Sequence, residues 1–153
     1  MRQDAGVPAD LTLVQRLVAA DHGLAFVAVT RADGSVQTSL VNAGVLAHPV
    51  TGDAAVGFVA RRSALKVSLI RRAGRAALAF RSGWEWAAVE GPATLIGTDD
   101  LVPDLDAAAV PALLRDVFTA AGGTHDDWAE FDRVMAAEGR LAVFVTPERV
   151  STN

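Results

Sequence analysis

The chain has 153 residues, of which 51% are hydrophobic and 21% are charged, and its formal net charge is −4. This composition is typical of a globular domain with a substantial core, and we expect residues 1–153 to form a single domain. The chain has no cysteine, no apolar run of about 18 residues and no apolar leader. We therefore expect a cytoplasmic protein with no disulfide, no thiolate metal site and no membrane partner.

The first half of the chain predicts one helix followed by an antiparallel meander. Apolar residues at helical spacing indicate a helix over residues 10–20, with Asp10 as its N-cap. Three strands are expected after it, over residues 23–31, 36–47 and 54–60. An Asp-Gly turn joins the first two strands and the turn HPVTGD joins the next two. Gly44 indicates a β-bulge in the second strand.

A short basic helix is predicted next, with Ser63 as its N-cap and Gly74 in the left-handed position that ends it. Two strands follow, over residues 75–82 and 84–97. Because strand side chains alternate, Trp84 and Trp86 share one face. Such a pair is typical of a core or a subunit interface as well as of a ligand platform.

The last third begins with an acidic loop, TDDLVPDLDAAAV. A helix then starts at Pro111 and ends at a double glycine. Thr124 is expected to cap a second helix, with two aspartates in its first turn. The buried stripe of that helix comprises Trp128, Phe131, Val134 and Met135. A closing strand over residues 140–150 brings the count to about six, and an antiparallel barrel with flanking helices would hide the sheet edges.

Positive charge is concentrated in one stretch of this acidic chain. Residues 54–84, called here the basic segment, contain no acid and seven bases, whereas the rest of the chain has 18 acids and 7 bases. The seven bases are Arg61, Arg62, Lys66, Arg71, Arg72, Arg75 and Arg81. The pattern indicates a site for a small, defined anion, because nucleic-acid-binding domains are more basic overall. The alternative is a solvated helix face.

Lys66 is the only lysine and falls in the first turn of the predicted basic helix. The helix dipole disfavours a cation there. An anion bound at the helix start would explain it; the alternative is an exposed lysine with a small cost in stability.

The sequence lacks familiar catalytic signatures. It has no G-x-S-x-G, no nucleotide-triphosphatase phosphate loop and no H-E-x-x-H, and the glycine spacing of GFVARRS does not match a dinucleotide fingerprint. His22, His48 and His125 lie far apart without the spacing of metal ligands, so we expect no metal site. An enzyme with this sequence would depend on a cofactor for its chemistry.

Five motifs, in this order, cover nearly the whole chain from about residue 10: DGSVQTSLVNAG, HPVTGD, FVARRSALKVSLIRR, GWEWAAVEGPATLIG and GGTHDDWAEFDRVMAAEGRLAVFVTPERV. Together they resemble the pyridoxamine-phosphate-oxidase-like family, in particular its branch that uses coenzyme F420, a deazaflavin hydride carrier. The resemblance implies an antiparallel split β-barrel of the FMN-binding type. It also implies a homodimeric oxidoreductase that transfers a hydride between reduced coenzyme F420 and a small organic substrate over the ring at the dimer interface. The alternatives are an FMN-dependent oxidoreductase and a non-catalytic cofactor-binding or carrier protein.

The resemblance also implies a set of cofactor-binding positions. The strand beside the flat ring supplies Gln37, Ser39 and Asn42. The segment that holds the phosphate and ribityl chain supplies Ala60, Arg61, Arg62 and Ser63.

Lys66 matches the family lysine of the basic motif, whereas Leu69 stands where relatives often have asparagine. Trp84 and Trp86 would reach the cofactor from a second subunit. Further arginines would meet the anionic tail of the cofactor. No catalytic residue stands out, and solvent or the substrate would supply the proton.

Overall fold

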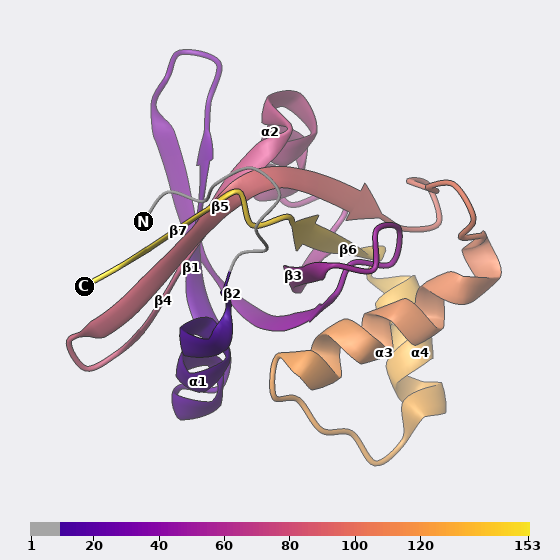
Figure 1. Ribbon diagram of the computed structural model, residues 1–153. Helices are drawn as coiled ribbons and strands as arrows, with labels where there is room; N and C mark the ends of the chain where they lie inside the picture. The colour runs from indigo at the N-terminus through magenta and orange to yellow at the C-terminus, as the bar shows by residue number, and fades with distance from the viewer. Residues whose placement is uncertain (1–9) are drawn as a thin grey trace.

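A single antiparallel sheet dominates the computed structural model, which describes residues 10–153 (Figure 1). Its strands run in the order β4-β1-β2-β3-β6-β5-β7, and the pairing of β4 with β5 closes the first six into a barrel. The strands are β1 (Leu24–Thr30), β2 (Val36–Ala47), β3 (Ala54–Arg61), β4 (Arg75–Ser82), β5 (Glu85–Ile96), β6 (Arg140–Val145) and β7 (Arg149–Thr152). The predicted antiparallel barrel is confirmed, although the single closing strand of the prediction is two strands, β6 and β7.

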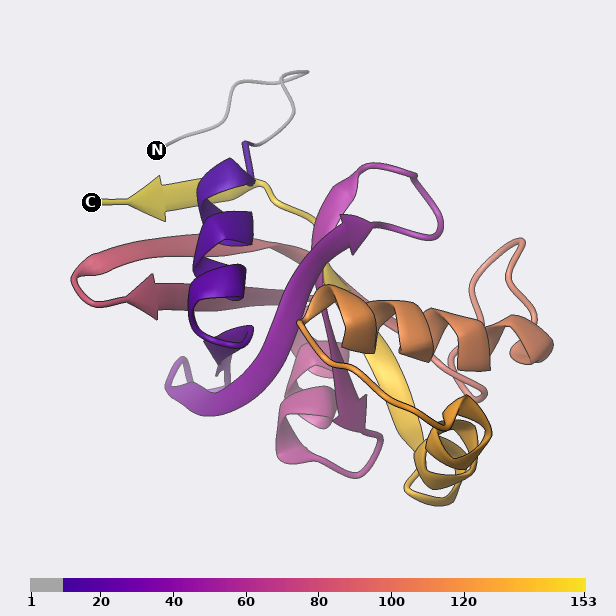
Figure 2. The same ribbon diagram turned by 90° about the horizontal axis from the view of Figure 1, so that it is seen from below.

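Four α-helices in the described part of the chain flank this barrel. They are α1 (Thr12–Ala20), α2 (Leu65–Ala73), α3 (Val110–Ala120) and α4 (Trp128–Ala137), and a 3₁₀ turn, η1 (Ala107–Ala109), leads into α3. In both views α1 lies on one side of the barrel and the pair α3–α4 on the other (Figure 1, Figure 2). No helix among residues 10–153 is long and apolar enough to cross a membrane.

Two hydrophobic clusters hold these elements together. The inward side chains of the barrel, such as Val27, Phe58 and Leu78, form one cluster with Leu17 of α1 and Ile70 of α2. The second cluster lies on the outer side of β3 and β6, beneath α3 and α4. The two helical groups therefore cover different faces, and no helix of residues 10–153 covers the outer side of β1, β4 and β5 in this way.

The ladder between β2 and β3 is only partial, and this defines the region of interest. The first half of β2 pairs with β1, and its second half pairs with β3. The last β2–β3 pair is Ala43 with Phe58, so residues 36–42 of β2 separate from residues 59–61 of β3. We call this divergence the fork and these two stretches its branches.

Gly44 has a packing role at the base of the fork. It pairs in register with Gly57, so the predicted bulge is wrong. A Cβ at this position would lie 2.2 Å from the carbonyl carbon of Ala120, at the end of α3. The glycine is therefore needed for the close approach of α3 to β2.

Helix starts differ from the predicted caps. Leu11 and Ala64 occupy the N-cap positions of α1 and α2 without a side-chain cap bond, so the assignments of Asp10 and Ser63 are wrong by one residue each. The Asp10 carboxylate still accepts the Thr12 N–H at 2.9 Å.

For α4 the cap is Asp127, which accepts the Glu130 N–H. The predicted cap Thr124 lies outside the helix, as do both aspartates expected in its first turn. The left-handed Gly74 at the end of α2 is confirmed, with φ of 70°.

Candidate functional site

The β2 branch of the fork carries two buried polar atoms without partners. Gln37 and Ser39 pair with Val29 and Val27 of β1, and alternation places their side chains on the barrel side with Val41. Gln37 Oε1 and Ser39 Oγ are buried and accept no hydrogen bond from any residue in the described range 10–153. A buried polar atom left unpaired costs about 1–3 kcal/mol. Such atoms fit a group that binds a ligand.

Asn42 lies on the opposite face of the same strand. Its side-chain amide donates to the carbonyl of Ala121 at 3.2 Å and to the carbonyl of His22. These bonds join β2 to the start of β1 and to the end of α3. The structure therefore brings Gln37 and Ser39 together but separates Asn42 from them. Asn42 lies three positions after Ser39, and strand residues separated by an odd number of positions face opposite sides.

The β3 branch leads into the other predicted positions. Ala60 faces the barrel and is only 4% exposed. The Arg61 guanidinium binds Glu138 at 2.8 Å, and that of Arg62 binds Asp99. Ser63 is exposed in the turn before α2. The main chain here is anchored, because the Arg62 N–H donates to the carbonyl of Gly139 at 2.9 Å.

Acids from other parts of the chain balance much of the basic segment. Besides Arg61 and Arg62, Arg71 pairs with Asp100 and Arg75 pairs with Glu148 at 2.9 Å. Hydrogen bonding to Arg75 lowers the pKa of the Glu148 carboxyl. These arginines are half exposed and ion-paired, so the solvated-face interpretation accounts for Arg71 and Arg75 better than the predicted contact with an anionic tail does.

Two bases of the segment, Lys66 and Arg81, have no hydrogen-bond or ion-pair partner within residues 10–153. Lys66 is the second residue of α2 and is partly buried. No side chain of residues 10–153 caps the start of α2, so free backbone N–H groups and an unpaired ammonium occur together shortly after the β3 branch. This combination suits an anion such as a phosphate.

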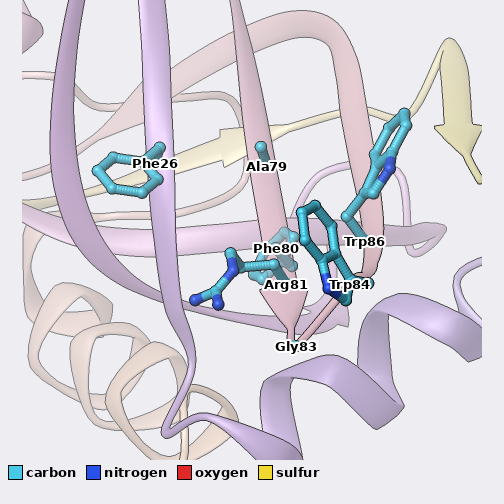
Figure 3. Close-up of a pocket in the computed structure, with 7 residues that line it drawn as sticks. All are labelled: Phe26, Ala79, Phe80, Arg81, Gly83, Trp84 and Trp86. Carbon is cyan, nitrogen blue, oxygen red and sulfur yellow. The ribbon is translucent and has the colours of Figure 1, made fainter.

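The predicted tryptophans lie on the outer side of the barrel. Figure 3 shows Phe26 of β1 facing Trp84 and Trp86 across Ala79, with Arg81 beside them. These residues line an open pocket of about 560 Å³. Trp84 is 93% exposed, in the turn between β4 and β5. Within one chain the tryptophans do not reach the fork, whose unpaired atoms lie on the inner side of β2.

This pocket is part of a larger exposed apolar surface, called here the apolar face. Its large members are Leu24, Phe26, Val36, Leu40, Trp84 and Trp86. Cross-strand registers place Leu40 beside Phe26 and Phe26 beside Ala79, so the surface is continuous across neighbouring strands. Contiguous apolar surface of this kind marks an interaction site.

His48 has a structural role at the turn between β2 and β3. Its Nδ1 accepts the Val50 N–H at 3.1 Å, and its Nε2 lies 3.4 Å from the Thr94 hydroxyl. Burial lowers the pKa of the His48 imidazole.

Residues 10–153 contain no cluster of histidine and acidic side chains suited to a metal ion.

No protein-family model and no curated protein sequence matches this chain, whereas solved structures do. A pyridoxamine 5′-phosphate oxidase-related, FMN-binding protein from Nostoc punctiforme matches with a TM-score of 0.64 at 15% identity, over 94% of this chain and 83% of that one. A protein named F420 reductase matches with a TM-score of 0.59 at 13% identity, over 90% and 94%.

A heme-binding protein from Mycobacterium smegmatis matches with a TM-score of 0.61 at 17% identity, over 96% of this chain and 55% of that one. Sequence identities this low establish a common fold and no common activity. The chain thus has the antiparallel split-barrel fold of these proteins.

Proposed function

We propose that the chain binds coenzyme F420 at the fork and transfers a hydride between the reduced deazaflavin and a small organic substrate. The observation that carries the proposal is that two buried atoms on one branch of the fork, Gln37 Oε1 and Ser39 Oγ, have no hydrogen-bond partner within residues 10–153. The other branch leads through residues 62–64 to Lys66 and the start of α2, which no side chain of residues 10–153 caps. A ligand with a polar ring edge and a phosphate satisfies both features. The structural likeness to an F420 reductase supports this choice.

Each residue has a binding or orienting part in this proposal. Gln37 and Ser39 would hold the polar edge of the ring, and Lys66 would bind the phosphate together with the N–H groups of α2. Arg62 would add a bidentate contact once Asp99 releases it. The cofactor, when bound, supplies the hydride; the protein orients the ring and excludes water. Solvent or the substrate would supply the proton.

We also propose that two copies of the chain meet through the apolar face. Phe26, Trp84 and Trp86 of this face line one pocket with Arg81, whose charge has no partner in the described chain, and a twofold axis would make this surface self-complementary. Trp84 of one copy would then approach the fork of the other, and ligand sites favour such concave interfaces.

FMN is the second candidate cofactor, favoured by the likeness to an FMN-binding protein. Its phosphate would use the same lysine and helix start. Titration of the purified protein with each cofactor, followed by absorbance, distinguishes the two. Tighter binding of coenzyme F420 supports the proposal, whereas tighter binding of FMN means that FMN is the cofactor instead. Binding without turnover with any electron acceptor indicates a carrier, and failure of both to bind overturns the proposal.

Ser39→Ala provides a sharper test, because it removes a hydroxyl oxygen that has no hydrogen-bond partner within residues 10–153 when no ligand is bound. Stability of the cofactor-free protein should rise by about 1 kcal/mol, since a buried unpaired hydroxyl is lost, while cofactor affinity should fall. Thr119→Ala, which removes an exposed hydroxyl from α3, should change neither quantity. Lower stability together with unchanged affinity would mean that the Ser39 hydroxyl serves only the fold.

A further inference from the structure

A second cavity, of about 370 Å³, lies between α3, α4 and the outer side of the sheet. It begins at the base of the fork, since Asn42 and Val59, the first residues of the two branches, both line it. Its volume falls within the range of about 300–1,000 Å³ that small-molecule sites occupy. It differs from the inner side of the fork, where Gln37 and Ser39 lie, and from the pocket on the apolar face.

Most of the wall is apolar, with aromatic rings held in fixed positions. Phe118 and Phe131 line the cavity with ring centroids 5.0 Å apart, and Trp128 stands edge-on to both behind the wall. Val134 and Met135 of α4 complete this side. Such rings need no rearrangement to receive a flat or branched apolar body.

His125 supplies a hydrogen-bond donor to this cavity. Its Nδ1 accepts the Asp127 N–H at 3.0 Å, so the neutral ring carries its proton on Nε2. Within residues 10–153, Nε2 has no hydrogen-bond partner. The rings of Trp128 and Phe131, with centroids at 5.8 and 5.7 Å, hold the imidazole in place.

Arg140 supplies positive charge. Its Nε and Nη2 lie 3.3 and 3.2 Å from Oε1 of Glu138, and the other oxygen of that carboxylate binds Arg61 at 2.8 Å. Two guanidinium groups therefore share one carboxylate, which leaves a net charge of about +1 in the cluster at neutral pH. No acidic residue among residues 10–153 lines the cavity.

We propose that this cavity binds a small organic acid, with its apolar body against Phe118, Phe131 and Met135 and its carboxylate at Arg140 and His125. A carboxylate suits the cavity because guanidinium and imidazole N–H groups both donate, and charge-assisted bonds to them are strong. The inference deepens the proposed function by naming a substrate class. The binding itself needs no cofactor, so the two proposals can fail separately.

The test uses cofactor-free protein and two probes of similar shape, naphthoate and the uncharged naphthyl methanol. Calorimetric titration should show naphthoate binding more tightly. Arg140→Gln should weaken naphthoate binding about tenfold or more, because a charge-assisted contact is lost, and should leave the uncharged probe unaffected. Arg133→Gln is the matched control: it makes the same charge change on α4 at a residue outside the cavity lining.

A second variant keeps the test decisive if Arg140→Gln does not fold. Val134 lines the cavity but is 42% exposed, so Val134→Trp should preserve folding and obstruct the cavity. Binding of both probes should then be lost, with a melting temperature close to that of the wild type. The proposal is overturned if the wild type does not bind naphthoate, or if binding survives in Val134→Trp. Equal losses in Arg140→Gln and Arg133→Gln would overturn it as well.

Discussion

Arg62, the residue after β3, is ion-paired with Asp99 in the loop after β5, so a carboxylate of the protein itself binds a guanidinium proposed to bind the cofactor phosphate. Both side chains are at least half exposed. An ion pair of this kind contributes only about 0–1 kcal/mol. A ligand phosphate can therefore displace Asp99 at little cost, and removal of the carboxylate should favour the ligand.

Asp99→Asn should strengthen binding of the phosphate-bearing cofactor by up to about fivefold, the equivalent of about 1 kcal/mol. Asp104→Asn makes the same change in net charge at an exposed acid of the same loop and should have a smaller effect. Cofactor titration at two salt concentrations measures both. Equal gains in the two variants would attribute the effect to net charge rather than to Arg62.

Lys66→Ala should weaken cofactor binding by about tenfold to a hundredfold, because a hydrogen bond from a charged donor contributes roughly 1.5–3 kcal/mol. The melting temperature without cofactor should hardly change, since a cation is removed from the unfavourable end of a helix dipole. Lys66→Arg separates charge from shape: recovered affinity means that charge suffices, and continued loss means that the site fits a compact ammonium. Wild-type affinity in Lys66→Ala would contradict the role given to this residue.

Phe26→Asp should dissociate the proposed homodimer, because it places a charge in the centre of the apolar face. Sedimentation at micromolar concentration should report a dimer for the wild type and a monomer for the variant. Val50→Asp is the control, since Val50 is 48% exposed in the turn between β2 and β3, away from this face. A monomeric wild type that still binds cofactor tightly would exclude the dimer.

Acidification should destabilise the protein as the pH falls through 6.5, the ordinary pKa of histidine. Burial holds the pKa of His48 below that value, so the unfolded chain takes up a proton that the native protein does not. Stability therefore falls as pH decreases in this range. His48→Asn should reduce this pH dependence in urea unfolding, whereas His22→Asn, at an exposed left-handed position, should preserve it. An unchanged profile in His48→Asn would assign the dependence to other groups.

Local sequence signals predicted the strands and turns well. The hairpin at Asp33 and Gly34 is confirmed: the aspartate accepts the Ser35 N–H at 3.0 Å and the glycine has φ of 88°. The interactions that stabilise such a turn lie within a few residues, so composition and spacing are sufficient to predict it. Helix caps were predicted less well, because the path of the chain into α2 and α4 decides which residue occupies the cap.

The candidate site was predictable only in part. The strand positions of Gln37 and Ser39 follow from a local pattern, and the same pattern could have placed Asn42 on the opposite face. The ion pairs that engage Arg61 and Arg62 join residues separated by 77 and 37 positions, a relationship that only the closed barrel creates. Likewise, nothing in the sequence signals that His125 and Arg140 line one cavity, because the packing of α3 and α4 against the sheet forms that cavity.

The fork also determines how readily the hairpin β1–β2 opens locally. β1 pairs with β4 only over residues 25–28, and β2 pairs with β3 only from Ala43 onward. Within residues 10–153, the hairpin tip, residues 29–41, is therefore held by its own rungs, by the buried side chains of Val29 and Val41, and by the Arg72 guanidinium, which donates to the Thr30 carbonyl at 2.8 Å. Amide hydrogens in this tip should exchange with deuterium faster than those of the closed barrel, since a two-stranded ribbon opens locally. A ligand bound between the branches would slow that exchange, because it would connect the hairpin tip to β3 and so reduce local opening of the tip.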